Sequence, residues 1–393
     1  MDHLIGIGGV GMSALAQALV CAGRAVSGAD RTLGTPALRR LEAQGVRVFP
    51  DDGSGVTAAT TRVVVSTAIE ETNPGLVRAR ELGVPVVHRA VALAELLSGR
   101  KLVAVCGTCG KSSVTAMLGH VLAACGFDPA VVDGAAVVGW NGAVRWGKGE
   151  WAVAEVDESD KSLTAFKPYA AIVTNASADH YSEAEINAVF DAFVKDVPGP
   201  VVDARGERYD AADFDAQNRS LAKRMAVALG ADPAAVDAAL ETFPGVERRL
   251  QRVGECAGAA VYDDYAHNPE KLRALLGALK RRHPKGVAIA WRPHGYGPLR
   301  KMMDALAAVF REALGPGDRL ALLPVYDAGG TADRSVNSDA LAALVPGAAL
   351  VEDLDDAERV LRAWAPSCGA VVTAGARDPG LPGLARRLAE ERT

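Results

Sequence analysis

The chain has 393 residues and a mass of 40.8 kDa, which at about 150 residues per domain predicts two or three domains. Its 49% hydrophobic and 23% charged residues are typical of globular proteins and exclude a disordered or fibrous chain. With 43 basic and 48 acidic residues the net charge is -5, which argues against a nucleic-acid partner.

The apolar runs and the cysteines indicate the compartment. The longest apolar runs have the length of a strand and fall short of the roughly 20 residues that cross a bilayer. Residues 1–4 lead straight into glycines, without the basic and apolar regions of a signal peptide. Six cysteines in a chain of this length do not form a disulfide scaffold. We therefore expect a reduced, cytoplasmic protein without a membrane partner.

Short β-rich apolar runs alternate with Ala/Leu-rich helical stretches along the chain. The predicted strands are Leu4–Ile7, Val63–Ser66, Leu102–Cys106, Ala152–Glu155, Ala171–Thr174, Ala259–Tyr262, Val287–Trp291, Leu320–Leu323 and Val371–Ala374. The predicted helices include Met12–Ala22, Ser113–Ala124, Pro269–Arg281 and Lys301–Ala313. Such alternation predicts parallel sheets with helices on both faces, which is an α/β fold throughout.

Two breaks in this pattern predict three domains. The first break lies at residues 97–100, ahead of a new strand, and the second at residues 244–247, after a Phe-Pro-Gly sequence. The resulting domains, 1–97, 98–244 and 245–393, each have the size of a small independent domain.

A glycine-rich turn opens the first domain. Gly6, Gly8 and Gly11 have the spacing G-x-G-x-x-G between a strand and a helix, where backbone N–H groups can approach a diphosphate. Asp30 ends the next predicted strand, at a position where a carboxylate can meet a ribose or a base. Three alternatives stay open: a dinucleotide and hence a dehydrogenase, a uridine diphosphate group, or a turn without a ligand. The domain is short for a complete dinucleotide-binding fold.

A phosphate loop of the form G-x-x-G-K-S opens the second domain, between a predicted strand and a predicted helix. Its residues are Gly107, Thr108, Cys109, Gly110, Lys111, Ser112 and Ser113. The backbone N–H groups, the lysine and the hydroxyl group of such a loop bind ATP phosphates and a magnesium ion. The alternative is a structural turn with a solvated lysine. Cys106 and Cys109 have C-x-x-C spacing but no second pair, so we predict no zinc or redox site.

Two further polar residues predict a metal site beside this loop. Glu155 and His180 follow predicted strands, and the carboxyl ends of parallel strands share one edge of a sheet. We therefore expect both to face Ser112 across a magnesium-sized site. Because histidine is an unusual ligand for Mg²⁺, Mn²⁺ is the alternative. Asp157 and Asp160 fit a solvated acidic loop.

The third domain carries two polar clusters after strands and a basic pair at its start. Arg249 follows the domain junction, Asp264 and His267 follow one strand, and His294 follows another. These positions predict a domain that closes over ATP, with Arg249 reaching the γ-phosphate. The alternative for each residue is an ordinary surface loop.

Taken together, these motifs resemble the Mur ligase superfamily, and within it the branch that adds L-alanine. The matching segments are G-I-G-G-V-G-M-S, V-S-G-A-D, V-S-T-A-I, P-V-V-H-R-A, G-T-C-G-K-S-S, E-V-D-E-S-D, I-V-T-N-A-S-A-D-H, F-P-G-V-E-R-R, D-D-Y-A-H-N-P and R-P-H-G-Y. The resemblance implies a small Rossmann-like domain, a P-loop ATPase-like central domain and a Rossmann-like C-terminal domain. It also implies that ATP activates a carboxylate, most simply that of UDP-N-acetylmuramate, as an acyl phosphate. An L-amino acid then attacks it in peptidoglycan precursor synthesis.

The resemblance also implies a role for individual residues. Those for the UDP substrate are Gly8, Gly9, Gly11, Asp30, Ser66, His88 and Arg89. Those for ATP are residues 107–113, Asn218, Arg249, Asp264 and His267, and those for the metal are Ser112, Glu155 and His180. The implied catalytic residues are Lys111, His180, Arg249 and His294, the last near the incoming amine. The partners are small molecules, and the chain is expected to be a monomer or a homodimer.

Three departures from the family pattern bear on the substrate. Cys109 replaces a usual histidine, and the stretch from His180 to Asn218 is shorter than in the family, which implies a shortened central domain. Gly295 and Pro298 replace two arginines that would grip the carboxylate of the amino acid. Neither residue can make a bidentate arginine–carboxylate contact. Two alternatives therefore stay open: a ligase for another carboxylate or amine, and a non-catalytic nucleotide-binding homologue.

Overall fold

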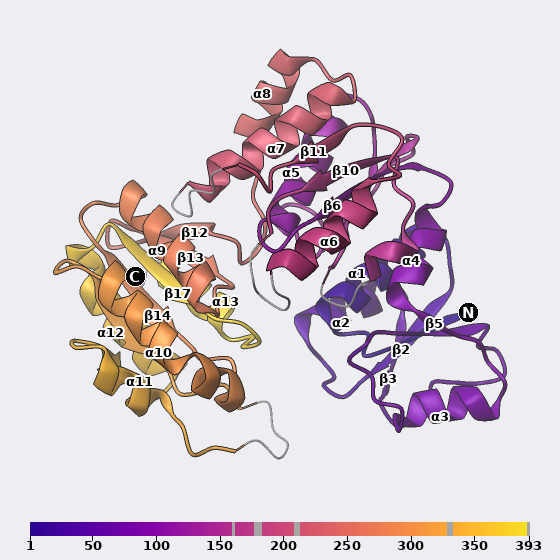
Figure 1. The fold of residues 1–393 in the computed structure, drawn as a ribbon. Helices are drawn as coiled ribbons and strands as arrows, with labels where there is room; N and C mark the ends of the chain where they lie inside the picture. The colour runs from indigo at the N-terminus through magenta and orange to yellow at the C-terminus, as the bar shows by residue number, and fades with distance from the viewer. Residues whose placement is uncertain (159–161, 177–182, 208–212, 328–332, 391–393) are drawn as a thin grey trace. The chain divides into compact units, whose positions relative to one another are not determined.

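The computed structural model describes residues 1–158, 162–176, 183–207, 213–327 and 333–390. These residues form two compact units, the first made of residues 1–207 and 215–246 and the second made of residues 213–214 and those from Glu247 on. Three helix-flanked sheets make up the α/β fold that the sequence predicts (Figure 1). The boundaries proposed at 97/98 and 244/245 stay predictions. Two residues of the sequence analysis, Asp160 and His180, lie outside the described residues.

The first sheet is parallel throughout and has the order β3-β2-β1-β4-β5. Strand β1 ends at Ile5, two residues before its predicted end, because Gly6 turns the chain with a φ of 71°. The elements are β1 (Asp2–Ile5), α1 (Val10–Cys21), β2 (Val26–Asp30), α2 (Pro36–Ala43), β3 (Arg47–Pro50), β4 (Arg62–Val65), α3 (Pro74–Glu81), β5 (Val86–His88) and α4 (Arg89–Leu97).

The second sheet has the order β11-β10-β6-β9-β7-β8 and is parallel except for β8. Strand β6 is buried on both faces, as its apolar sequence predicts, and lies between β10 and β9. Residues that follow these three strands therefore meet at one edge. The elements are β6 (Lys101–Cys106), α5 (Lys111–Ala124), β7 (Ala130–Val132), β8 (Val144–Trp146), β9 (Trp151–Glu155), η1 (Ser162–Ala165), β10 (Ala170–Val173), α6 (Glu183–Val194), β11 (Val201–Asp203), α7 (Phe214–Ala228) and α8 (Pro233–Glu241).

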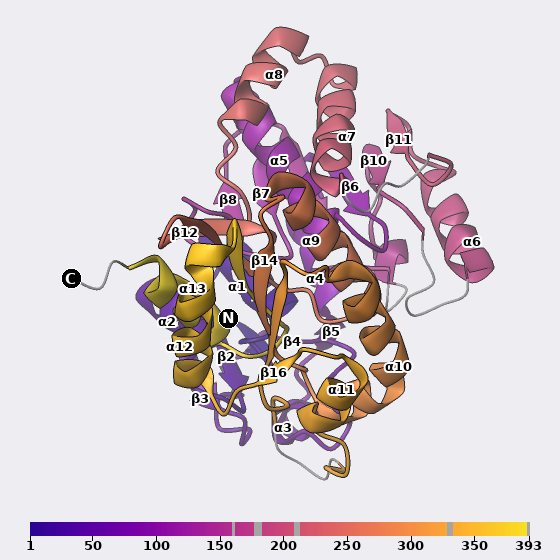
Figure 2. The same ribbon diagram turned by 90° about the vertical axis from the view of Figure 1, so that its left-hand side faces the viewer.

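The third sheet, in the second unit, has the order β12-β13-β17-β14-β15-β16, with only β12 antiparallel to its neighbour. Its elements are β12 (Gln251–Cys256), β13 (Ala259–Asp264), α9 (Pro269–Arg282), β14 (Val287–Trp291), α10 (Tyr296–Ala313), β15 (Arg319–Leu322), α11 (Ser338–Leu344), β16 (Ala349–Leu350), α12 (Leu354–Trp364), η2 (Ala365–Ser367), β17 (Ala370–Ala374) and α13 (Leu381–Ala389). Figure 2 shows α9, α10 and α11 on one side of this sheet and α12 and α13 on the other. Helix α10 begins five residues before its prediction, because Pro298 fits the first turn of a helix.

Helix starts are strongly encoded in the sequence. In the described part of the chain, four helices begin with a side chain that accepts a hydrogen bond from the first turn, followed by a proline that needs no N–H partner there. These pairs are Thr35–Pro36, Asn73–Pro74, Asp232–Pro233 and Asn268–Pro269. Among the described residues, no helix is long and apolar enough to span a membrane.

A continuous core joins the first two sheets. Leu15 of α1 and Phe166, which follows η1, belong to the same cluster of buried hydrophobic residues. The amide of Gln17 adds two polar contacts, since it donates to the carbonyl of Asn141 and accepts from the N–H of Ala143 at 3.1 Å. The glycine-rich turn and the phosphate loop are therefore carried by one compact unit.

Candidate active site

The phosphate loop lies between β6 and α5, in the centre of the second sheet. Gly107 and Gly110 have left-handed φ values of 125° and 83°, which favour glycine. A Cβ atom at Gly107 would overlap the hydroxyl of Thr174, and one at Gly110 would lie 2.6 Å from Oδ1 of Asn218. Because the two glycines have no side chains, the loop packs closely against Thr174 and Asn218. Asn218, in α7, therefore lies beside the loop.

Thr174 and Asn175, directly after β10, hold the loop in its conformation. The Thr108 hydroxyl donates to Asn175 Oδ1 at 2.6 Å, and the N–H of Cys109 donates to the same oxygen at 2.9 Å. The Cys109 carbonyl in turn accepts from the Thr174 hydroxyl at 2.6 Å and from Asn175 Nδ2 at 3.2 Å. Thr174 and Asn175 were not predicted as site residues, although polar residues that follow a strand beside the loop are a signal for such a role.

Lys111, at the start of α5, is held inside the loop. Its ammonium group donates to the Gly107 carbonyl at 2.7 Å and to the two carboxylate oxygens of Glu158 at 3.1 and 2.9 Å. The Lys111 and Glu158 side chains are only 15% and 7% exposed. Burial acts to lower the pKa of Lys111, but the carboxylates of Glu158 and Glu155 outweigh it, and the net pKa is raised. The raised pKa favours the protonated, cationic form of Lys111 at the loop.

Ser112 and Glu155 form the oxygen pair of the expected metal site. The Ser112 hydroxyl donates to Glu155 Oε2 at 2.7 Å, and the N–H of Gly134 donates to the same oxygen at 3.1 Å. Hydroxyl and carboxylate oxygens are ligands that Mg²⁺ prefers, so this pair fits the ion. His180, the third expected ligand, lies outside the described residues. Within the described ranges, no three His, Cys, Asp or Glu side chains gather in a metal-binding group.

The glycine-rich turn of the first sheet is held by Asp30. The N–H of Gly8 donates to Asp30 Oδ2 at 2.8 Å, and the N–H of Thr32 donates to Oδ1 at 2.9 Å. A Cβ atom on Gly8 would lie 2.9 Å from the same carboxylate. Asp30 therefore lies beside the turn and binds its backbone, while its predicted contact with a ribose or a base stays a prediction.

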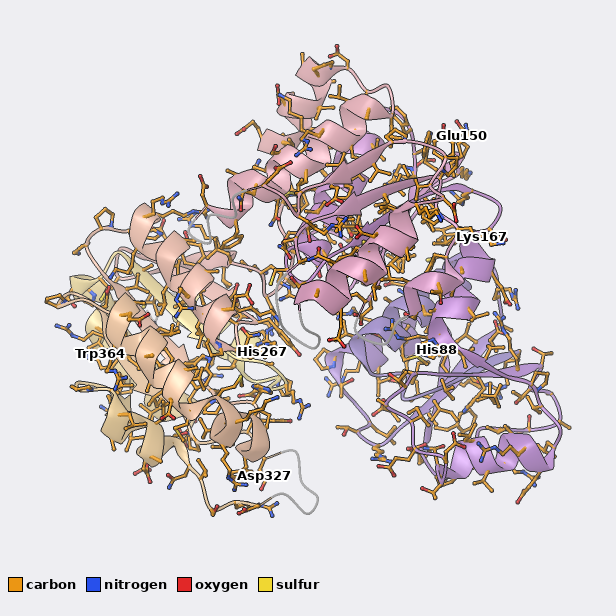
Figure 3. All side chains as sticks on the ribbon, viewed as in Figure 1. His88, Glu150, Lys167, His267, Asp327 and Trp364 are labelled. Atoms are coloured by element: carbon orange, nitrogen blue, oxygen red, sulfur yellow. The ribbon has the colours of Figure 1, made fainter. Side chains whose placement is uncertain are left out.

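Arg89, the first residue of α4, extends from the first sheet toward the second. Its guanidinium lies 3.0 Å from the position of a Cβ atom on Gly11 and 3.2 Å from Oδ2 of Asp157, which follows β9. His88, labelled in Figure 3, caps α4 by accepting from Ala90 N at 3.3 Å. The acidic segment after β9 therefore contacts both the phosphate loop and the residues assigned to the UDP substrate.

Gly9 and Ser66 complete the set that was assigned to the UDP substrate. Gly9 is the residue before α1, and its N–H donates to the Gly6 carbonyl at 3.0 Å. Ser66 is half-buried and directly follows β4. Both therefore lie at the carboxyl edge of the first sheet, where open α/β sheets bind ligands.

In the second unit, the carboxylate of Asp264 holds the segment that carries Arg249. Its oxygens accept from the N–H groups of Leu250 at 2.6 Å and Ala266 at 2.7 Å. The Arg249 guanidinium lies over the ring of Tyr265, 5.4 Å from its centroid. Both carboxylate oxygens of Asp264 thus accept hydrogen bonds from the backbone, and they hold the segment that carries Arg249 in place.

His267 and His294 lie against each other in the same unit, with ring centroids 4.8 Å apart. Burial lowers the pKa of His267 to about 4, and Lys271 adds to the effect (His267 is labelled in Figure 3). Burial and the nearby charge of Arg377 also lower the pKa of His294. Both rings are therefore neutral near pH 7. The structure brings Arg249, Asp264, His267 and His294 together in one unit.

Two family models match the chain. The model described as "Mur ligase family, catalytic domain" matches residues 3–101, and the model described as "Mur ligase, glutamate ligase domain" matches residues 248–377.

Curated relatives named UDP-N-acetylmuramate--L-alanine ligase extend the match over most of the chain. The protein of Synechococcus sp. is 35% identical, with 87% of this chain and 82% of the relative covered. The protein of Sinorhizobium fredii is 32% identical, with 86% of this chain and 85% of the relative covered. The protein of Burkholderia ambifaria is also 32% identical, with 96% of this chain and 95% of the relative covered.

Solved structures agree with this match. UDP-N-acetylmuramate-alanine ligase of Thermotoga maritima has a TM-score of 0.82 and 26% identity, with 98% and 97% of the two chains covered. The murein peptide ligase of Psychrobacter arcticus has a TM-score of 0.68 and 20% identity over the same shares, which shows the fold alone.

Fold and site define an α/β enzyme whose phosphate loop lies beside a Rossmann-like sheet. The relatives make the class specific, since they match along nearly the whole chain. The chain belongs to the Mur ligase family and is an ATP-dependent ligase.

Proposed function

We propose that the chain joins the carboxylate of UDP-N-acetylmuramate to the amino group of an L-amino acid, with ATP as the energy source. The names of the relatives support the UDP-sugar substrate. The observation that carries the proposal is the Ser112–Glu155 oxygen pair beside the buried cation of Lys111. This oxygen pair and cation serve phosphoryl transfer, so a protein that only binds a nucleotide would not need them.

The residues of the phosphate loop would act on the charges of the reaction. A carboxylate and a triphosphate repel each other, so the positive charge of Lys111 and the backbone N–H groups of the loop lower the barrier to their approach. Ser112 and Glu155 would hold Mg²⁺, with Mn²⁺ as the alternative and His180 as a further proposed ligand. The bound ion would neutralise phosphate charge.

The remaining residues divide between the two units. Gly8, Gly9, Gly11 and Arg89 are proposed for the UDP substrate, together with Asp30, Ser66 and His88. In the second unit we assign Arg249 and His267 to the triphosphate, Asp264 to the support of the Arg249 segment, and His294 to the amine. A neutral His294 can accept a proton from an ammonium group as it becomes a nucleophile.

A second candidate is a ligase of the same chemistry with an amine other than L-alanine. It is favoured by the segment that starts α10, where Gly295 and Pro298 stand at the positions of two family arginines. The nearby Arg300 is bound to Asp333 at 2.7 Å and to Ser335 at 2.9 Å. These contacts engage the guanidinium that would most simply replace the missing arginines.

One experiment tests both candidates. Purified protein is incubated with ATP, Mg²⁺, UDP-N-acetylmuramate and each member of a panel of amino acids, and phosphate release is measured. Release that requires the UDP sugar and L-alanine supports the first candidate, and release with the sugar and another amino acid supports the second. No release with any pair, or release that needs neither, contradicts both. Lys111→Ala serves as the inactive control.

A further inference from the structure

The ammonium group of Lys111 has no hydrogen-bond donor to spare. An ammonium group carries three N–H donors. In this structure three oxygens accept them: the carbonyl of Gly107 and both carboxylate oxygens of Glu158. Lys111 can donate to a phosphate oxygen only if it gives up at least one of these contacts.

The buried position of Glu158 makes its carboxylate depend on the contact with Lys111. Its side chain is 7% exposed, so its charge has lost most of its hydration and depends on Lys111. Among the described residues of the segment, the carboxylates of Glu155 and Asp157 contact other groups, although their charges also act on Lys111. Glu155 accepts from Ser112 and Gly134, while Asp157 pairs with Arg89. Glu158 is therefore the carboxylate that directly contacts the loop lysine.

The charge of Glu158 opposes the charge of any phosphate that enters the loop. Two like charges in a site with little water repel each other more strongly than on the surface. The same carboxylate balances Lys111 while the loop holds no phosphate, so that an unpaired buried cation does not destabilise the fold.

We propose that Glu158 is a positioning residue that holds Lys111 as a resident counter-ion and is partly displaced by the triphosphate. ATP binding thus exchanges at least one Glu158 oxygen for a phosphate oxygen, and Glu158 sets the affinity of the loop for ATP. The proposal rests on the ATP binding of the proposed function, and it concerns a residue to which that function gives no role.

The test compares the dissociation constant of ATP with Mg²⁺, without UDP sugar or amino acid, by calorimetry. Glu158→Gln keeps the shape of the side chain and removes its charge. The variant should bind ATP more tightly than the wild type, by roughly tenfold if one charge-assisted contact is released. Asp157→Asn is the matched control, because it removes a neighbouring charge that pairs with Arg89 and acts on Lys111 without a hydrogen bond to it. Its gain in ATP affinity should be clearly smaller than that of Glu158→Gln.

A second measurement does not depend on ATP. Lys111→Met leaves Glu158 without its cation and should lower the temperature of thermal unfolding, and the double variant K111M/E158Q should recover part of the loss. Unchanged or weaker ATP binding by Glu158→Gln overturns the proposal, as does a double variant that unfolds no later than Lys111→Met. If the wild type does not bind ATP at all, the proposed function fails instead.

Discussion

The carboxylate of Glu155 occupies the space that a side chain on Gly134 would need. A Cβ atom at this glycine would overlap all three atoms of the carboxyl group, and the N–H of Gly134 donates to Glu155 Oε2 at 3.1 Å. Gly134 lies between β7 and β8, so a loop that carries none of the predicted site residues determines where Glu155 meets Ser112.

Gly134→Ala should therefore impair metal binding, although Gly134 is not itself one of the proposed metal ligands. The methyl group displaces the Glu155 carboxylate from Ser112, and the Mg²⁺ concentration needed for half-maximal turnover should rise, as in Glu155→Ala. Metal titrations of ligase activity measure this effect. Gly99→Ala is the control, because a Cβ atom there meets no atom within 4 Å. Unchanged metal dependence in both Gly134→Ala and Glu155→Ala would contradict the metal assignment.

Lys111→Ala should abolish turnover, because the buried cation of the phosphate loop has no replacement. The phosphate-release assay measures the effect, which for a lost charge at a transferring phosphoryl group is typically at least about a hundredfold. Lys101→Ala is the matched control, since that lysine pairs with Glu150 at the surface, with side chains 47% and 62% exposed. Near-normal turnover of Lys111→Ala would remove the assignment of the loop.

Asn175→Ala should weaken ATP binding although the residue need not touch ATP. Its side chain makes three hydrogen bonds with Thr108 and Cys109, and their loss loosens the loop. We expect KM for ATP to rise by about tenfold or more. Asn337→Ala, which removes a cap from α11 in the second unit, should leave this KM unchanged. An equal rise in both variants would point to general destabilisation.

The stability of the first unit should fall in mild acid because of His3. Burial lowers the pKa of this histidine to about 4, with Asp51 acting in the opposite direction. The unfolded chain, with a histidine pKa of about 6.5, binds a proton as pH falls from about 6.5 to about 4, whereas the folded state does not. The free energy of unfolding therefore decreases through this window, by at most about 3 kcal/mol.

His3→Asn tests this linkage, because an asparagine can keep a contact to Ser27 but does not titrate. Urea unfolding of both proteins near pH 7 and near pH 5 gives the comparison. The variant should lose less stability than the wild type between the two conditions. Equal losses would show that other groups cause the acid sensitivity.

The sequence predicted the parts of the fold that depend on local pattern. The predicted bounds of β14 and the C-terminal ends of α5 and α10 are confirmed, because apolar runs and helix-forming residues define them. The family, the α/β class and the position of residues 107–113 between a strand and a helix are confirmed as well. Short edge strands such as β8 and β16 were not predicted, because strands of three and two residues are too short to show the alternating hydrophobic pattern of a strand.

The site was predictable in its residues but not in its contacts. Motifs identified Lys111, Ser112 and Glu155, whereas the partners Glu158, Gly134 and Asn175 depend on how distant loops pack. Asp264 illustrates the difference. Its position in a motif suggested contact with ATP, yet its oxygens bind backbone N–H groups. The individual site roles stay predictions until the variants are measured.

The amide of Gln17 has a practical consequence for anyone who divides this protein into fragments. A truncation after residue 97 would cut the shared apolar cluster and leave this amide without Asn141 and Ala143. Such a fragment would expose a hydrophobic surface that is buried in the intact unit, and it is expected to aggregate during expression. Residues 1–246, kept whole, contain the entire first compact unit.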